Sequence, residues 1–399
     1  SMTRVTIDPK TLLPPGGHEF STVVEATQHL VADRTMTWDA SGYGSHAETS
    51  VPSPATTWYL AEGATHSGFD LFYLLQNPTD TNTRVRVRYL QPSGEVLEKD
   101  YLVAARSREN IWVDYEQFEG RGTALDNTDV SAVLTSLDGT PIIVERAMYL
   151  SAPGRLFNAG HESAGITAPA TRWFLAEGAT GPYFDLFMLL ANPQSQAAEV
   201  TLAYLLPDGT TYSRALTLPA NTRQNIWVDL ETFPGVDGQP LADTAVSTTV
   251  TVTNGVPIVV ERAMWWPGGW STWQEAHNSA GATVTGTVWA MADGESGGPR
   301  GHETYILMAN TSEFAGSARV TLVFEDGTTV ARTYFLPATS RTSAGVMYDF
   351  PEAAGRRFAA IVESLGDTPA QLVVERAMYS DGGGLHWGAG TNALATRLR

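Results

Sequence analysis

The architecture of this chain can be read from one stretch, Ile142-Ile143-Val144-Glu145-Arg146-Ala147-Met148-Tyr149. Close copies of it return as Ile258-Val259-Val260-Glu261-Arg262-Ala263-Met264-Trp265 and as Leu372-Val373-Val374-Glu375-Arg376-Ala377-Met378-Tyr379, and a weaker copy is Leu30-Val31-Ala32-Asp33-Arg34-Thr35-Met36. The three close copies are spaced roughly 115 residues apart, and this spacing is the size of a small domain rather than of a solenoid turn. The sequence is therefore a tandem array, and we call this stretch the closer.

A second motif, the opener, keeps the same period. It reads Trp58-Tyr59-Leu60-Ala61-Glu62-Gly63-Ala64-Thr65, then Trp173-Phe174-Leu175-Ala176-Glu177-Gly178-Ala179-Thr180, and in a degraded form Trp289-Ala290-Met291-Ala292-Asp293-Gly294. Opener and closer together predict an N-terminal partial repeat at 1–50 and three full repeats at 51–165, 166–281 and 282–399. Residues 1–50 resemble the second half of a repeat, and we expect them to pack on the next repeat or to mark a boundary within a longer array.

Each repeat has the pattern of an all-β domain. Alternating Val, Tyr and Leu positions flank turn triplets at Pro92-Ser93-Gly94, Pro207-Asp208-Gly209 and Glu325-Asp326-Gly327, where Gly supplies a positive φ. About seven short strands per repeat, with hardly any helical period, predict tandem antiparallel β-sandwiches of immunoglobulin-like type. A β-propeller-like arrangement is the alternative, although blades are usually about 40–50 residues long. We expect a linear, semi-rigid string.

Composition narrows the classes of partner. Lys+Arg 25 against Asp+Glu 43 gives a net charge of −18, which argues against nucleic acid and anionic membrane surfaces. The chain has no cysteine, hence neither a disulfide nor a thiol nucleophile, which is compatible with export. No apolar run reaches the about 18 residues of a membrane span, so we expect no membrane insertion.

The closer places a charge on each of its faces. Successive strand side chains point to opposite sides, so Glu145 and Arg146 face opposite ways and one of them enters the core. A recurring buried charge requires a recurring countercharge. We expect the opener acids to face the closer arginines, and a second set of arginines to face the closer glutamates. The predicted structural ion-pair network comprises Glu62, Arg108, Glu145, Arg146, Glu177, Arg223, Glu261, Arg262, Asp293, Arg341, Glu375 and Arg376. The alternative is an acidic and basic functional site in each repeat.

A histidine motif follows each closer. Its copies contain His46, His161, His277 and His386, and the middle two lie shortly before the next opener. We expect these histidines to be joint residues that hydrogen-bond to backbone, with metal binding as the alternative. Neither H-E-x-x-H, a P-loop nor G-x-G-x-x-G is present. We therefore predict no enzyme and no catalytic residue. An enzyme would require Glu62, Asp70 and His161 to converge in an open cleft.

The tryptophans fall into two groups. Those at repeating strand positions are predicted to be core: Trp58, Trp112, Trp173, Trp227 and Trp289. A Gly/Pro-interrupted loop after the second closer carries Trp265, Trp266, Trp270 and Trp273, and it is either an exposed ligand-binding patch or buried between repeats 2 and 3. We expect no cofactor. Ca²⁺ near Asp70, Asp185 and Glu303 is the alternative, although a dense D-x-D-x-D run is missing.

The motifs also carry a resemblance that covers residues 3–390. The opener W-[YF]-L-A-E-G-A-T, the following L-L-x-N-P and the closer V-E-R-A-M-[YW] resemble a family of uncharacterised bacterial extracellular tandem repeats. Repeat 3 departs from it, with Asn310-Thr311 in place of Asn-Pro. The resemblance implies a location outside the bacterial cell and no catalytic residue.

From these patterns we predict a non-enzymatic stalk, spacer or adhesive segment of a bacterial cell-surface or secreted protein. Its expected partners are polysaccharide, cell wall or another surface protein. The alternative is a carbohydrate- or cell-wall-binding module that uses the Trp265 to Trp273 loop.

Overall fold

A computed structural model describes residues 2–38, 41–152, 154–269 and 273–399. The chain is nearly all β, as the sequence predicted. The helical segments within the described residues are single turns: Pro9–Thr11, Val113–Tyr115, Val228–Leu230, Pro351–Ala353 and α1 (Val346–Asp349). No helix in this part of the chain has the length and apolar character needed to cross a membrane.

Repeat 1 (residues 51–165) forms two four-stranded antiparallel sheets. Its strands are β3 (Thr57–Leu60), β4 (Phe69–Asn77), β5 (Thr83–Leu90), β6 (Val96–Val103), β7 (Ser107–Trp112), β8 (Ser131–Ser136), β9 (Ile143–Ala152) and β10 (Arg155–Ala164). One sheet has the order β3-β8-β5-β6 and the other the order β10-β9-β4-β7. Both sheets contribute to a common apolar core, which makes the repeat a β-sandwich.

Repeat 2 (residues 166–281) has the same arrangement. Its strands are β11 (Arg172–Leu175), β12 (Asp185–Asn192), β13 (Ala198–Leu205), β14 (Thr211–Leu218), β15 (Thr222–Trp227), β16 (Ser247–Val252), β17 (Val259–Trp266) and β18 (Glu275–Ala280). The sheet orders are β11-β16-β13-β14 and β15-β12-β17-β18, which match repeat 1 strand for strand.

Repeat 3 (residues 282–399) keeps this plan and adds two short strands. Its strands are β19 (Val288–Met291), β20 (Glu295–Ser296), β21 (Glu303–Asn310), β22 (Gly316–Phe324), β23 (Thr329–Leu336), β24 (Ser340–Gly345), β25 (Arg356–Leu365), β26 (Leu372–Gly382), β27 (Leu385–Leu394) and β28 (Thr396–Arg397). The orders are β23-β22-β25-β19-β28 and β24-β21-β26-β27, and β20 pairs with β25. The N-terminal half-repeat (residues 1–50) supplies β1 (Asp33–Thr37) and β2 (Ser45–Thr49), which pair only with each other in the described structure.

Alternation along the strands builds these sandwiches. In β5 every second side chain from Thr83 to Tyr89 is buried, whereas the arginines between them reach the surface. The predicted hairpin turns join β5 to β6, β13 to β14 and β22 to β23. Their glycines Gly94, Gly209 and Gly327 have φ of 83°, 87° and 81°, a conformation that favours residues without a Cβ.

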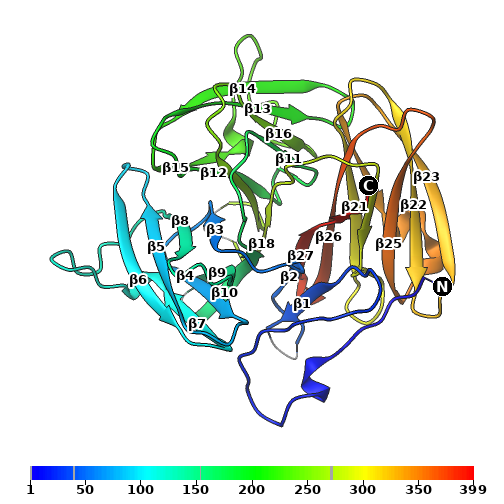
Figure 1. Cartoon of the computed structure of the whole chain (residues 1–399). Coiled ribbons are helices and arrows are strands. Elements are labelled where there is room, and N and C mark those ends of the chain that lie inside the picture. The colour runs from blue at the N-terminus through cyan, green and yellow to red at the C-terminus, as the bar shows by residue number, and fades with distance from the viewer. Residues whose placement is uncertain (1, 39–40, 153, 270–272) are drawn as a thin grey trace.

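One strand of each repeat and one strand of the half-repeat meet at the centre of the molecule (Figure 1). β10 lies beside β2 and β18, and β27 lies beside the same two strands. These four strands close a ring, with the sandwiches of repeats 1, 2 and 3 outside it and the half-repeat in the fourth position. Identical contacts repeated from one unit to the next close a ring when each rotates the chain by about a quarter turn.

The linear string that we expected is therefore wrong. The half-repeat contacts repeat 1, where Arg34 pairs with Glu145 at 3.1 Å, and also repeat 3, where Arg4 pairs with Asp293 at 3.0 Å. The two ends of the array meet because repeat 3 offers the half-repeat the same surface that repeats 1 and 2 offer to the units that follow them.

The predicted core tryptophans divide by position. The opener indoles Trp58, Trp173 and Trp289 are fully buried. Trp112 departs from the prediction, since 37% of its surface is exposed. It is the last residue of β7, where its ring lies 4.9 Å from Phe72 and 4.6 Å from Tyr115 at the surface.

Candidate functional site at the joints between repeats

The closer arginines lie at the boundaries between repeats. Arg146 Nη1 lies 2.5 Å from Glu261 Oε2, and Arg262 Nη1 lies 2.7 Å from Glu375 Oε2. In each pair the arginine belongs to one repeat and the glutamate to the next, and all four side chains are 0% exposed. A charge so far from water requires a partner, so the Glu261-Arg262 dipeptide links repeat 2 to both of its neighbours.

The same glutamates cap the opener of the preceding repeat. Glu261 Oε1 accepts a hydrogen bond from the backbone N–H of Ala61 at 2.8 Å, and Glu375 Oε1 accepts one from Ala176 at 2.8 Å. The carbonyl oxygens of these alanines accept from arginines of the following repeat, Arg223 at 3.4 Å and Arg341 at 3.3 Å. Each joint thus binds both backbone groups of the opener alanine.

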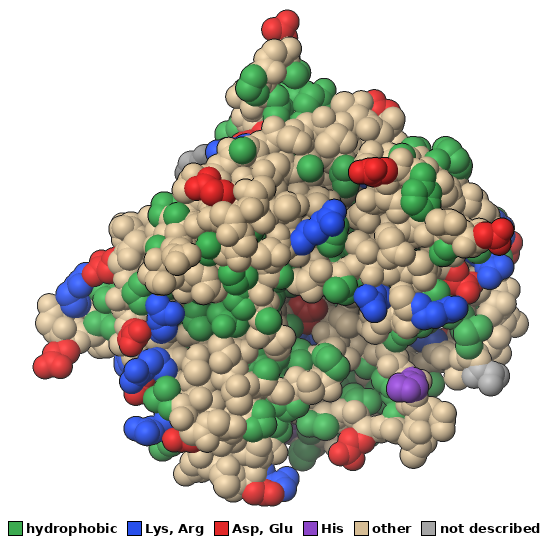
Figure 2. Space-filling model, turned by 45° about the horizontal axis from the view of Figure 1, so that its top comes forward, with side chains coloured by type: hydrophobic (Ala, Val, Ile, Leu, Met, Phe, Trp, Pro, Cys, Tyr) green, Lys and Arg blue, Asp and Glu red, His purple; other side chains and the backbone are tan. Residues whose placement is uncertain are grey.

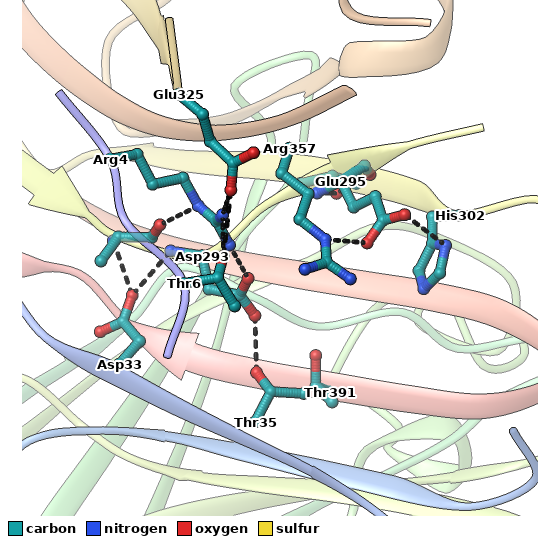
Figure 3. A network of polar contacts seen from close by, with 12 residues as sticks. Arg4, Thr6, Asp33, Thr35, Asp293, Glu295, His302, Glu325, Arg357 and Thr391 are labelled. Carbon is teal, nitrogen blue, oxygen red and sulfur yellow. Dashed lines mark hydrogen bonds and ion pairs between the residues drawn. The ribbon is translucent and has the colours of Figure 1, made fainter. Parts of the chain in front are cut away.

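The half-repeat reproduces this joint on repeat 3. Asp33 Oδ2 accepts from the backbone N–H of Ala292 at 2.7 Å, and Arg4 Nε donates to the carbonyl of Ala292 at 2.9 Å. Arg4 and Thr35 also hydrogen-bond to the opener acid Asp293, at 3.0 and 2.6 Å. Figure 3 shows Arg4, Asp33 and Thr35 converging on Asp293. Arg4 therefore corresponds to Arg223 and Arg341, and Asp33 corresponds to the closer glutamates.

The expected ion pairs are found only in part. The closest match to the prediction is Arg146 with Glu62, at 3.2 Å, whereas Arg376 lies 3.9 Å from Asp293. Arg262 donates to the backbone carbonyl of Glu177 at 3.0 Å rather than to its carboxylate.

The second set of arginines was paired with the wrong acids. Arg223, expected to face Glu261, contacts Asp129 of repeat 1 at 3.1 Å, and Arg341 contacts Glu177 of repeat 2 at 3.4 Å. Arg108 lies 3.5 Å from Glu19. Strand alternation predicts that a buried arginine needs an acidic partner. The packing of one repeat on the next decides which acidic residue lies close enough to pair with it.

The opener acids differ in their surroundings. The pKa of Glu62 is lower than usual. Burial by itself would raise this pKa, but the nearby His161 and Arg146 outweigh the effect of burial. Burial likewise opposes the low pKa of Asp293, which Arg376, Thr35 and Arg4 maintain. For Glu177 burial dominates over Arg341 and Arg262, and its pKa is raised. The three joints share a geometry but not a charge balance.

Three of the predicted histidines belong to the central ring. His46, His161 and His277 lie on β2, β10 and β18 and are buried. Each of them also contacts a side chain. His161 Nε2 lies 3.3 Å from Glu62, His46 Nδ1 lies 3.2 Å from Glu162 and His277 Nε2 lies 3.1 Å from the hydroxyl of Tyr379. Burial lowers the pKa of His277 well below its usual value, with Arg262 as a further cause, which favours the neutral ring.

His386 does not take the fourth position. Its side chain is 65% exposed and its Nδ1 lies 3.0 Å from Asp381. The residue of β27 opposite Met378 is Thr391, just as His277 is opposite Met264 in repeat 2. The three hairpins have the same register at this point, and His386 lies next to the turn that follows β26, away from the centre.

The aromatic loop is largely buried. Trp265 and Trp266 are 2% and 1% exposed, so their faces are not open to a ligand. Trp266 donates from Nε1 to the carbonyl of Trp387 at 2.9 Å, which places it between repeats 2 and 3. Trp273 is partly buried, stacks on Trp265 with ring centroids 5.0 Å apart, and donates to Asp185 at 2.6 Å. Trp270 lies outside the described residues.

The residues named for an enzyme do not share an open cleft. Glu62 and His161 are in contact but enclosed, and Asp70 accepts instead from Trp112 Nε1 at 3.2 Å, on the surface. Among the described residues, no group of three His, Asp or Glu side chains is placed to hold a metal ion. Asp185, one of the carboxylates considered for Ca²⁺, accepts from the backbone of Gly269 at 2.7 Å.

Two open depressions lie on repeat 3 or at its edge. One, of about 350 Å³, is lined by Arg172, Phe174, Thr285, Thr311, Ser312, Glu313, Phe314 and Gln371. The other, of about 450 Å³, is lined by Glu295, Glu325, Asp326, Gly355, Arg356 and Arg357. Figure 2 shows acidic and basic side chains interspersed over one face rather than gathered by sign.

Several polar residues of the central ring were not anticipated. Asn278 Nδ2 donates to Glu62 Oε2 at 2.7 Å across the first joint, and Glu162 pairs with both Arg34 and His46. The copies G-H-E-S, A-H-N-S and G-T-N-A each carry two polar residues in succession, at 161–162, 277–278 and 391–392. The sequence signal that could have identified these residues was a pair of consecutive polar residues at the same position of each repeat.

Comparison with known proteins assigns no family. No family model matches the chain, and no curated protein matches it. Among solved structures, Thermotoga maritima 1070 is 16% identical, with 28% of this chain and 94% of that chain covered and a TM-score of 0.25. The Anabaena sensory rhodopsin transducer is 21% identical, with 24% and 85% covered and a TM-score of 0.20. A tetra-tandem repeat of a large adhesion protein is 12% identical, with 94% and 84% covered and a TM-score of 0.13. Likenesses this low leave the function to be argued from the residues.

Proposed function

We propose that this chain is a non-enzymatic adhesive module of a bacterial surface or secreted protein. The observation that supports the proposal is the burial of every closer Glu-Arg pair of repeats 2 and 3 inside a joint. The charged residues that recur are thereby accounted for by assembly of the ring, and their repetition calls for no catalytic role.

A compact adhesive module fits the ring better than a linear spacer. A spacer gains length with every repeat, whereas repeats around a closed ring turn back on themselves and present their loops outward. The loops and strand ends at the perimeter are therefore the surfaces offered to a partner.

The surface that we favour for adhesion is an aromatic ledge on repeat 1, formed by Phe72, Trp112 and Tyr115. Tyr115 is 64% exposed, and the Trp112 ring packs edge to face against it at 4.6 Å. Flat rings that are held in place by their neighbours lose little freedom on binding and suit polysaccharide or cell-wall polymers. This ledge replaces the Trp265 to Trp273 loop as the candidate, because two of the loop's indoles are enclosed.

Retention on insoluble polysaccharides and bacterial sacculi tests the proposal. The proteins compared are the unmodified chain, a Trp112→Ala/Tyr115→Ala variant and a matched Tyr348→Ala control, since Tyr348 also follows a strand end, of β24, and is 71% exposed. Adhesion predicts that the first variant is lost from the matrix while the control is retained. No retention of the unmodified chain on any matrix would refute the adhesive function, and equal loss in both variants would refute the ledge.

A further inference from the structure

The opener acid of the first joint, between repeats 1 and 2, is held at one oxygen atom. Oε2 of Glu62 lies 3.2 Å from Nη2 of Arg146 and 3.3 Å from Nε2 of His161. Nδ2 of Asn278 donates to the same oxygen at 2.7 Å. All four side chains are buried. Three nitrogen atoms from three strands therefore converge on the position of a single negatively charged atom.

The second joint, between repeats 2 and 3, leaves two of the corresponding nitrogen atoms without a partner. The corresponding residues are Arg262 on β17, His277 on β18 and Asn392 on β27, and β18 and β27 lie side by side near the centre (Figure 1). Within the described residues, neither Nη2 of Arg262 nor Nδ2 of Asn392 has a hydrogen-bond partner, although both side chains are buried. Nε2 of His277 lies 3.1 Å from the hydroxyl of Tyr379. Buried donors are nearly always satisfied by protein, ordered water or an ion.

The position of Asp129 distinguishes the two joints. Asp129 pairs across the first joint with Arg223, whose Nη1 lies 3.1 Å from its carboxylate. The residue at the same position in repeat 2 is Ala245, because Asp129 and Ala245 form the same β-bridge to their openers, with Ala64 and Ala179. The second joint thus lacks the acid that Arg223 uses in the first.

Without that acid, the second joint uses its opener acid in a different way. Arg341 lies 3.4 Å from Oε2 of Glu177, whereas Arg262 contacts only the backbone carbonyl of Glu177, at 3.0 Å. The carboxylate that would stand between Arg262 and Asn392 is therefore engaged by Arg341. The second joint has two carboxylates, those of Glu177 and Glu375, for its two arginines, where the first joint has three.

We propose that the second joint binds a small monovalent anion of the chloride class between Arg262 and Asn392, at the position that Oε2 of Glu62 takes in the first joint. A guanidinium and an amide group supply the N–H donors, and the anion brings the negative groups of this joint to three, as in the first. Because the donors converge on the place of one atom, a halide suits the site better than sulfate or phosphate, whose several oxygens need more donors. The site is enclosed by the joint, so the anion binds the assembled ring and not the separated repeats.

Amide hydrogen exchange of β18 and β27 in sodium chloride, with sodium gluconate at equal ionic strength as the reference, tests the proposal. An anion that binds only the assembled joint should slow exchange by about tenfold at about ten times its dissociation constant. Ala245→Asp gives the second joint the acid that the first joint has, releases Glu177 from Arg341 and should abolish the effect of chloride. Ala331→Asp is the matched control, since Ala331 is exposed on β23, and it should keep the full effect.

Bromide, which replaces chloride and scatters anomalously, locates the anion in crystals of the unmodified chain. A bromide peak between Arg262 and Asn392 supports the proposal, and an ordered water molecule there without anomalous signal would overturn it. Equal slowing of exchange by chloride in all three proteins would overturn the assignment to the second joint, and no slowing in the unmodified chain would overturn anion binding altogether. Should Ala245→Asp fail to fold, Asp129→Ala takes its place: it removes the acid from the first joint and should add a chloride effect at β10.

Discussion

Replacing Arg262 by Met should weaken the joint between repeats 2 and 3 severely. Arg262 Nη1 lies 2.7 Å from Glu375 Oε2, and both side chains are 0% exposed. The substitution keeps much of the side-chain volume but removes the guanidinium that neutralises Glu375, while the N–H of Ala176 still donates to this carboxylate.

The expected magnitude follows from burial. Removing one partner of a buried ion pair costs about 3–5 kcal/mol, because the remaining charge stays in a medium of low polarity. The same change at an exposed pair costs about 1 kcal/mol or less. Arg319→Met is the matched control, because Arg319 lies 2.8 Å from Glu363 in the same repeat and its side chain is 47% exposed.

Urea unfolding, with amide exchange resolved along β17 and β26, measures the effect. Exchange is needed because a ring of several sandwiches need not unfold in one step. The double variant Arg262→Met/Glu375→Leu should recover most of the loss, since an apolar pair replaces the ion pair without leaving a buried charge. A cost for Arg262→Met no larger than that for Arg319→Met would refute the reasoning.

Further predictions concern register, protonation and packing. His277→Ala should lower the free energy of unfolding by about 1–3 kcal/mol, because it removes the side chain that hydrogen-bonds to the buried hydroxyl of Tyr379. His386→Ala, at an exposed side chain, should change it by less than about 0.5 kcal/mol. Thermal unfolding of the two variants measures both effects. Burial raises the pKa of Asp229 to about 6, so the folded chain binds this proton more tightly than the unfolded chain, and the free energy of unfolding should rise as pH falls from about 6 toward about 4. Asp229→Asn should flatten that rise in a pH series of urea titrations, and an unchanged slope would exclude this group as its source. Trp266→Ala should cost about 3–5 kcal/mol through the cavity left between repeats 2 and 3, and a loss below about 1 kcal/mol would show that the joint closes over the missing ring.

Much of the local structure follows from short-range rules. The alternation in strands such as β5 and the turn glycines at 94, 209 and 327 act within a few residues, so their effects can be read without knowledge of the rest of the chain. The need for a countercharge beside Arg146 follows from strand geometry in the same way.

The sequence could not show which charged residues pair with each other. The closers of repeats 1, 2 and 3 are nearly identical, so the sequence does not distinguish an acid of the same repeat from one of the next as the partner of Arg146. The prediction for His386 was wrong for a related reason, because the motif aligned it with His161 and His277, whereas strand pairing places Thr391 at their position. Both errors concern which of several similar groups come into contact.

The sequence alone determined the repeat, its strands and the presence of buried charges, because these depend on periodicity within a strand and on the chemistry of single residues. Only the tertiary structure decided that the array closes, that Glu261 meets Arg146, and that Arg4 and Asp33 take up the joint on repeat 3. Closure depends on the rotation between successive sandwiches, and that rotation is set by many packed side chains at once rather than by any local motif.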